Sequence, residues 1–113
     1  MKVVRVTLAV DELDLMVALY NEAFQCGLEP ISGSPLFLGS FAGVEFQLCP
    51  NSLAGVVADQ NRHQLRLAVE DPEGLAKSVT SAGGAIVNRS GSGDRNVIGV
   101  TDPEGNTMEL VSN

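Results

Sequence analysis

The stretch LAVDE at residues 8–12 recurs as LAVED at residues 67–71, an offset of 59 positions. Both copies close a stretch in which apolar residues alternate with others, and both precede a segment whose apolar residues have helical spacing. Alternation with a period of two is typical of a strand that covers a core with one face. The repeat therefore predicts a chain built from two similar halves.

In the first half, residues 4–10 alternate, with Val4, Val6, Leu8 and Val10 on one face. The helix that follows is expected to end near Gly27, because glycine readily adopts the left-handed conformation of a helix C-terminus. Its apolar residues form a single stripe. They are Leu13, Met16, Val17, Tyr20 and Phe24.

In the second half, residues 64–69 alternate in the same way. The Asp71 carboxylate can accept hydrogen bonds from the free amides of the next helix, and Pro72 fits its first turn, where a missing N–H costs nothing. The glycines at 83–84 are expected to stop this helix.

Three short strands are expected after each helix, so that each half has the order β-α-β-β-β. A linker at 51–62, with a helical turn around residues 53–58, would join a first module, 1–50, to a second module, 63–113, within one domain of 113 residues. The expected strands are 29–33, 36–39 and 44–49, then 85–87, 96–100 and 106–111.

Residues 100–110, VTDPEGNTMEL, indicate a turn followed by a strand. Asp102 can bond within its own turn, Pro103 fixes φ, and Gly105 permits a positive φ. Together with the duplicated pattern, this segment resembles the vicinal oxygen chelate superfamily, which includes glyoxalase I, extradiol dioxygenases and the bleomycin and fosfomycin resistance proteins. The resemblance covers about residues 2–112.

The resemblance implies an α+β fold, in which two βαβββ modules form curled mixed sheets around a cleft, with the helices outside. It also implies a homodimer. Metal-dependent members of the superfamily place their ligands on the first and last strand of each module, where the side chains face the cleft.

Carried onto this sequence, those ligand positions fall on Arg5 and Gln47 in the first module and on Gln64 and Glu109 in the second. The pleat supports the last-strand positions independently. Val44, Phe46 and Leu48 would face one helix, and Met108 and Leu110 the other, so their neighbours in sequence point away from the helices. By the same parity Arg66, with Glu45 and Thr107, points to the concave side.

These residues depart from a metal-binding pattern. The Arg5 guanidinium has no lone pair to donate, and Gln64 offers an amide oxygen where the superfamily usually has His. His63 lies one position away and would need a β-bulge to reach the same face. The sequence therefore predicts no metal cofactor, with a divalent metal held by Glu109, Gln47 and either His63 or Gln64 as the alternative. In place of a metal, Arg5 is predicted to pair with Glu109.

The predicted ligand-binding residues are Arg5, Gln47, Gln64, Arg66 and Glu109, and no catalytic residue is assigned. A bland interpretation stays open beside this one. Arg5 can equally be a surface residue at the end of a strand, and the mixed charges can equally form a solvated sheet face.

Composition limits the classes of partner that the protein is expected to bind. The net charge is −7 and no cluster of Lys and Arg occurs, which disfavours nucleic acid, because binding to its phosphates relies on basic side chains. No apolar run long enough to span a membrane and no signal peptide is found, and two cysteines are too few for a disulfide framework. We expect a cytoplasmic protein with no membrane partner.

Three functions are compatible with these observations. The first is a metal-free protein that binds a small polar molecule in the cleft, like the drug-sequestering resistance proteins. The second is a lyase, isomerase or dioxygenase that depends on a divalent metal. The third is a non-catalytic dimerisation module. A fold alone does not decide among them.

Overall fold

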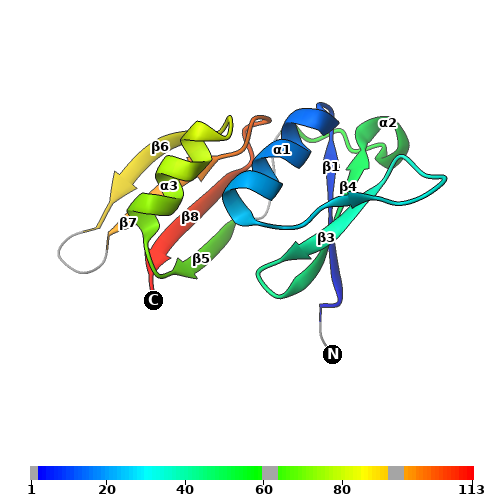
Figure 1. Ribbon diagram of the computed structural model, residues 1–113. Helices are drawn as coiled ribbons and strands as arrows, with labels where there is room; N and C mark the ends of the chain where they lie inside the picture. Colours follow the sequence, from blue (N-terminus) through cyan, green and yellow to red (C-terminus); the bar gives the residue numbers. More distant parts are fainter. Residues whose placement is uncertain (1–2, 60–63, 92–95) are drawn as a thin grey trace. The chain divides into compact units, whose positions relative to one another are not determined.

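The computed structural model describes residues 3–59, 64–91 and 96–113. The chain divides into two compact units, unit one (Met1–Val57) and unit two (Ala58–Asn113), and the boundary falls inside the predicted linker at 51–62. Each unit contains one strand, one long helix and three further strands, as the sequence repeat predicts (Figure 1). None of the helices in the described part of the chain is long and apolar enough to cross a membrane.

Unit one forms a four-stranded sheet with the strand order β1-β4-β3-β2. β1 and β4 run parallel, whereas the β4–β3 and β3–β2 pairs are antiparallel. Its elements are β1 (Arg5–Val10), α1 (Leu13–Phe24), β2 (Glu29–Pro30), β3 (Phe37–Phe41), β4 (Val44–Pro50) and the short α2 (Asn51–Ala54).

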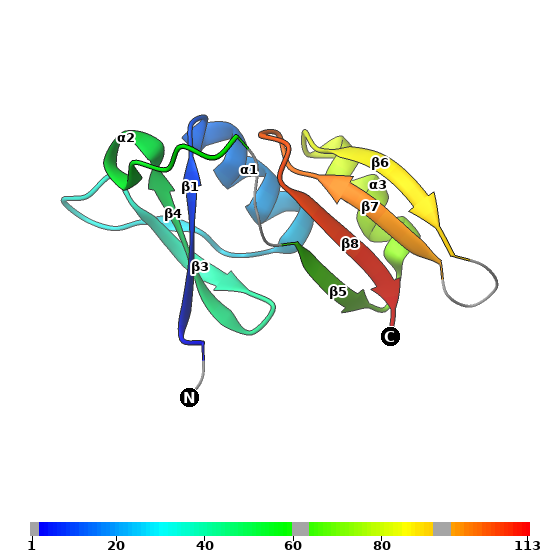
Figure 2. The same cartoon turned by 180° about the vertical axis from the view of Figure 1, so that it is seen from behind.

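Unit two repeats this topology as β5-β8-β7-β6, with β5 and β8 parallel and the other two pairs antiparallel. Its elements are β5 (Leu65–Val69), α3 (Pro72–Ser81), β6 (Ala85–Ser90), β7 (Val97–Thr101) and β8 (Thr107–Ser112). In Figure 2, the face of this sheet that is turned away from α3 lies toward the viewer. Two mixed sheets and their helices confirm the predicted α+β class, while the cleft stays a prediction.

The end of α1 differs from the prediction. The helix ends at Phe24, and Gln25 rather than Gly27 is its left-handed cap, with φ 53°. The Asn21 side chain holds the turn, since its Oδ1 accepts from the Leu28 N–H at 2.6 Å and its Nδ2 donates to the Leu28 carbonyl at 3.1 Å. Gly27 is also left-handed, with φ 63°, but it lies beyond the helix.

Two further expectations need correction. The strand predicted at 29–33 is confined to Glu29–Pro30, because the chain turns at Gly33, with φ 75°, and Ile31 bonds back to Leu36. The helical turn predicted around 53–58 forms earlier, at Asn51–Ala54. The Asn51 side chain closes it by bonding both the N–H and the carbonyl of Val56.

The turn chemistry of unit two is confirmed. Asp71 accepts a hydrogen bond from the Gly74 N–H at 3.0 Å, and Pro72 opens α3. The buried Asp102 accepts from the N–H groups of Glu104 and Asn106 at 2.9 and 3.0 Å. Gly105 has the positive φ, 86°, that its turn requires.

The cores of the two units differ in kind. In unit one Tyr20 and Phe24 of α1 pack against Phe41 and Phe46 of the sheet, with ring centroids 5.0–5.9 Å apart. Unit two has no aromatic residue at all. Its buried hydrophobic residues, among those that the structure describes, are Ala76, Val79, Ile98, Val100, Met108 and Leu110.

The alternation predicted for residues 4–10 is only partly matched by burial. Leu8 is half-buried and Val10 is buried, but Val4 and Val6 are 66% and 42% exposed. β1 is also at the edge of its sheet, and among the residues that the structure describes it pairs with β4 alone. The start of β1 is therefore an apolar edge.

Candidate functional site

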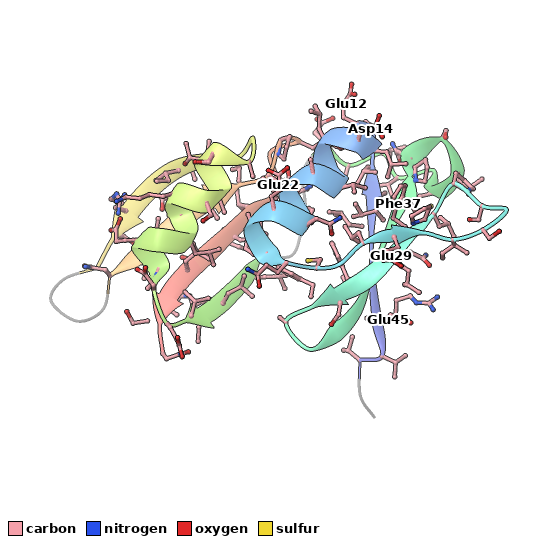
Figure 3. All side chains as sticks on the ribbon, in the orientation of Figure 1. Glu12, Asp14, Glu22, Glu29, Phe37 and Glu45 are labelled. Atoms are coloured by element: carbon pink, nitrogen blue, oxygen red, sulfur yellow. The ribbon has the colours of Figure 1, made fainter. Side chains whose placement is uncertain are left out.

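The first and last strands of unit one carry two polar pairs on the face turned away from α1, here called the open face of the unit. Phe46 and Leu48 are buried on the helix side, so their neighbours Glu45 and Gln47 point the other way. Because β1 and β4 are paired in register, Arg5 lies opposite Glu45. The Arg5 Nε donates to Glu45 Oε2 at 2.6 Å, and Figure 3 shows Glu45 on the sheet, apart from α1.

The second pair of unit one is weaker. Thr7 lies opposite Gln47, and the Gln47 amide approaches the Thr7 hydroxyl at 3.5 Å, at the limit of a hydrogen bond. An ion pair and an amide–hydroxyl pair therefore lie two residues apart along the same two strands.

Unit two has the same two kinds of pair on the face turned away from α3, its own open face. Gln64, just before β5, donates from Nε2 to the Thr107 hydroxyl at 3.0 Å. Arg66 Nη2 donates to both carboxylate oxygens of Glu109, at 3.1 and 3.2 Å. The Glu109 side chain is 24% exposed, whereas that of Arg66 is 59% exposed.

The order of the pairs is exchanged between the units. With the offsets of the repeat, Arg5 corresponds to Gln64, and Gln47 corresponds to Glu109. The ion pair of unit one therefore occupies the level of the amide–hydroxyl pair in unit two, and the reverse holds one level further along the strands. Each unit keeps one charged and one neutral pair across its parallel strands.

Each of the five residues predicted to bind a ligand thus takes part in a polar pair. The pairs join β1 with β4 in unit one, and β8 with β5 or the residue just before it in unit two. Arg5 and Gln47 form such pairs in unit one, and Gln64, Arg66 and Glu109 in unit two. The sequence predicts a pair between Arg5 and Glu109, but each of these side chains has an ion-pair partner inside its own unit. Their roles in binding stay predictions.

The donor chemistry at the four superfamily positions does not fit a divalent metal ion. A guanidinium cannot coordinate, Gln47 and Gln64 offer only amide oxygens, and Arg66 already holds both oxygens of Glu109. Within residues 3–59, 64–91 and 96–113, no three His, Cys, Asp or Glu residues are grouped so as to hold a metal. His63, the alternative ligand, lies outside the described residues.

The cysteines lie apart from these pairs. Burial raises the pKa of the Cys26 thiol from 9.0 to about 12, because the thiolate is poorly solvated there. Cys49 is buried at the end of β4. A thiol with so high a pKa is not a nucleophile at neutral pH, so Cys26 serves packing.

Sequence reasoning missed two residues beside Glu109. The strand predicted at 85–87 ends before Asn88, and Gly99 lies inside the strand predicted at 96–100. In the structure a β-bulge shifts the β6–β7 register between Ile86 and Asn88, which brings Asn88 opposite Gly99. Gly99 in turn is the strand partner of Glu109. An isolated glycine in an alternating strand is the signal that could have indicated a bulge or a close approach.

Unit two also has a shallow hollow of about 190 Å³ beside the end of β6. Arg89, which lines it, forms an ion pair with Glu73 of α3 across it. Among the carboxylates of unit one, Glu12, Asp14 and Glu22 are exposed at or on α1 (Figure 3). Neither feature adds a group to the polar pairs.

Comparison with known proteins places these observations in a family. The family model for the Glyoxalase-like domain matches residues 5–111. A search of curated protein sequences finds no match.

Solved structures share the fold at low sequence identity. A glyoxalase-related enzyme from Fulvimarina pelagi has a TM-score of 0.77 at 20% identity, covering 100% of this chain and 88% of its own. A glyoxalase/bleomycin resistance protein from Albidiferax ferrireducens T118 has a TM-score of 0.72 at 18% identity, covering 97% of both chains. The fosfomycin resistance protein FosX from Listeria monocytogenes has a TM-score of 0.79 at 14% identity, covering 100% of this chain and 93% of its own.

Proposed function

The chain belongs to the glyoxalase-like domain family, and on that premise we propose that it binds a small polar molecule through the open faces of its sheets, without a metal ion. The proposal assigns the contacts to Arg5, Gln47, Gln64, Arg66 and Glu109. The protein acts in the cytoplasm as a homodimer. No catalytic residue is included.

The observation that carries the proposal is the ion pair between Arg66 and Glu109. Both Glu109 oxygens accept hydrogen bonds from the guanidinium, and such charge-assisted pairs are stronger than neutral ones. A metal ion would have to displace a permanent cation from the one superfamily position that carries an acid. The arginine therefore takes the electrostatic place of a metal, while it keeps N–H groups available to a ligand.

The open face of each unit offers a ligand a different arrangement of groups. Side chains that already pair with each other are held in position, which lowers the entropy lost when a ligand binds. Unit one offers the Arg5–Glu45 pair beside the Gln47 amide, and unit two offers the Gln64 amide beside the Arg66–Glu109 pair. A ligand with several hydrogen-bonding groups suits either face, taken by itself, better than an apolar ligand does.

The dimer proposal is supported by the apolar edge of β1. Val6 is exposed on an edge strand and Val4 just before it, and unpaired strand edges are favourable sites for pairing with another chain. A second copy that covers this edge would bury both side chains.

The alternative is a lyase, isomerase or dioxygenase that depends on a divalent metal. It is favoured by Glu109, which retains the acidic residue that metal-dependent members of the superfamily use at this position. It requires Arg66 to release the carboxylate, and the two glutamines or His63 to complete the ligand set.

Binding can be tested by NMR titration of ¹⁵N-labelled protein with fosfomycin, bleomycin and glycolamide. The first two are chosen because a bleomycin resistance protein and a fosfomycin resistance protein share this fold. We expect saturable shifts of the Arg66 Nε–H and Gln64 amide signals with at least one compound, and at least fivefold weaker binding in Arg66→Gln. Arg89→Gln is the matched control, since Arg89 is an exposed, ion-paired arginine of the same unit. The proposal fails if none of the three compounds shifts these signals, or if Arg66→Gln binds as well as Arg89→Gln.

A further inference from the structure

The bulge in β6 turns Asn88 onto the open face of unit two. Ile86 pairs with Val100, but the next pair is Asn88 with Gly99, so Val87 is the extra residue. In an uninterrupted antiparallel ladder Val87 would lie opposite Gly99, and Asn88 would point to the helix side. β-Bulges often re-aim a side chain next to a functional site.

Gly99 provides the space that the Asn88 side chain occupies. A Cβ added at Gly99 would collide with the Asn88 carboxamide oxygen, and it would lie 2.9 Å from Cγ and 3.2 Å from Nδ2. Ile98 and Val100, on either side, are buried on the helix side, so this space is on the open face. The Asn88 amide therefore lies over Gly99.

With Asn88 on the open face, polar side chains extend across the whole sheet of unit two. We call Asn88, Glu109 and Arg66 together the polar row. The register places Asn88, Gly99, Glu109 and Arg66 side by side on β6, β7, β8 and β5. Asn88, lying over the glycine, thus neighbours the Glu109 carboxylate. Among the described residues, no hydrogen bond to the Asn88 amide is found, so its N–H and carbonyl groups are available to a ligand.

Unit one lacks this arrangement. The strand partner of Gln47 on β3 is Leu38, and the β2–β3 pairing continues from Leu38 to Glu29 without a bulge. Its glycine on β3, Gly39, serves the helix side instead, where a Cβ would collide with the Cys26 carbonyl. The extended polar row is specific to unit two.

We propose that Asn88 is a specificity-determining residue, which together with Glu109 and Arg66 binds an uncharged ligand group that donates and accepts hydrogen bonds side by side. A carboxamide, or a hydroxyl next to a carbonyl, is such a group. This inference rests on the proposed function and names the chemical class that unit two selects.

The charges of the row determine the class. Glu109 only accepts hydrogen bonds, Arg66 only donates them, and the Asn88 amide does both. An anionic group near Arg66 would also approach the Glu109 carboxylate, and like charges brought together at a binding surface are costly. The net charge of −7 disfavours anions further. A neutral group with a donor and an acceptor satisfies all three side chains.

The test is an NMR titration of the full chain with glycolamide and with its charged counterpart, glycolate. The Asn88 side-chain amide signals are assigned by their loss in Asn88→Ala. We expect glycolamide to shift these signals together with the Arg66 Nε–H, and glycolate to bind at least fivefold more weakly. In both Asn88→Ala and Gly99→Ala the glycolamide dissociation constant should rise at least fivefold, a loss typical of one hydrogen bond.

Asn96→Ala is the matched control, because Asn96 is an exposed asparagine of the same unit that lies outside the polar row. This variant should bind glycolamide with the same dissociation constant as the wild type. If glycolamide shifts the Arg66 signal but Asn88→Ala binds it normally, or if glycolate binds equally well, this inference is wrong while the proposed function stands. If none of glycolamide, fosfomycin and bleomycin shifts any signal of the polar pairs, the proposed function itself fails.

Discussion

Units one and two share one topology but differ in the residues that build it. The parallel pairing of β1 with β4 is repeated by β5 with β8, and both sheets have the same strand order. Yet unit one packs four aromatic rings under its helix, and unit two packs only aliphatic side chains and methionine. The positions of apolar residues, rather than their identities, therefore determine this fold.

The open faces differ in a second way. Each has one ion pair and one amide–hydroxyl pair, but the order along the strands is exchanged, and only unit two adds Asn88 through a bulge. The open face can therefore change its chemistry while the core and register are kept. The binding specificity of the protein is expected to lie mainly in unit two.

The largest expected loss of stability comes from a substitution in the turn that leads into the last strand of unit two, where the two units differ. Unit one uses a tight turn at Ala42 and Gly43, both with positive φ, whereas unit two relies on the buried carboxylate of Asp102. Asp102→Ala would leave the N–H groups of Glu104 and Asn106 without their acceptor. We expect a loss of about 3 kcal/mol in the free energy of unfolding, measured with urea. Asp102→Asn, which keeps one oxygen, should lose less; a loss below about 1 kcal/mol for Asp102→Ala would contradict this role.

The next effect compares the cores at equivalent positions. Phe46 and Met108 occupy matching sites on β4 and β8, and both are buried. Phe46→Leu should cost about 2 kcal/mol, because it removes the ring contacts to Tyr20 and Phe41 and leaves space. Met108→Leu should cost below about 1 kcal/mol, since the two side chains are similar in volume. If chemical denaturation showed the same loss in the free energy of unfolding for both variants, the aromatic cluster would contribute no more to stability than the aliphatic packing of unit two.

Alkaline pH should affect unit one, which holds both cysteines. The folded-state pKa of Cys26 is about 12 and that of an unperturbed thiol is 9.0, so its contribution to stability is complete below pH 9 and is lost as the pH rises toward 12. Between pH 8 and pH 10 the wild type should lose about 1 kcal/mol more than Cys26→Ala. The measurement is urea unfolding of both proteins at the two pH values. Parallel behaviour would mean that the thiol is not desolvated.

The smallest effects concern the ion pairs, measured by double-mutant cycles. Arg66 with Glu109 should give a coupling of about 0.5–1 kcal/mol, and Arg5 with Glu45, whose carboxylate is more exposed than that of Glu109, about 0.3 kcal/mol. The cycle of Arg5 with Glu109 tests the pair that sequence reasoning favoured. We expect it below about 0.3 kcal/mol, because each side chain has another partner; a larger value would restore that pair.

Much of the fold could be predicted from the sequence, because strand parity and turn chemistry are local. The repeat gave both βαβββ patterns, and Phe46, Leu48, Met108 and Leu110 fixed the direction of their neighbours. The cap at Gln25 was missed, since the turn after the helix is stabilised by bonds from the Asn21 side chain to the backbone of Leu28, seven residues further along the chain. Such contacts override the usual preference for glycine.

The binding role of the five candidate residues stays a prediction, but the structure shows which side chains they pair with, and the sequence did not indicate those partners. Which carboxylate an arginine meets depends on the register between β1 and β4 or β5 and β8, and the sequence alone does not state that register. Asn88 was missed because a bulge reverses the parity of every residue after Val87. Only the glycine at 99 indicated that the ladder was irregular.

The most direct test of the account is the effect of divalent metals on thermal unfolding. Protein treated with a chelator is melted alone and then with Ni²⁺, Zn²⁺, Mn²⁺ or Fe²⁺. A metal that binds the folded state must raise the midpoint by mass action. Since Arg66 holds the Glu109 carboxylate, we predict no rise with any of the four ions. A saturable rise that is lost in Glu109→Gln would contradict the account and identify a metal-dependent member of the family.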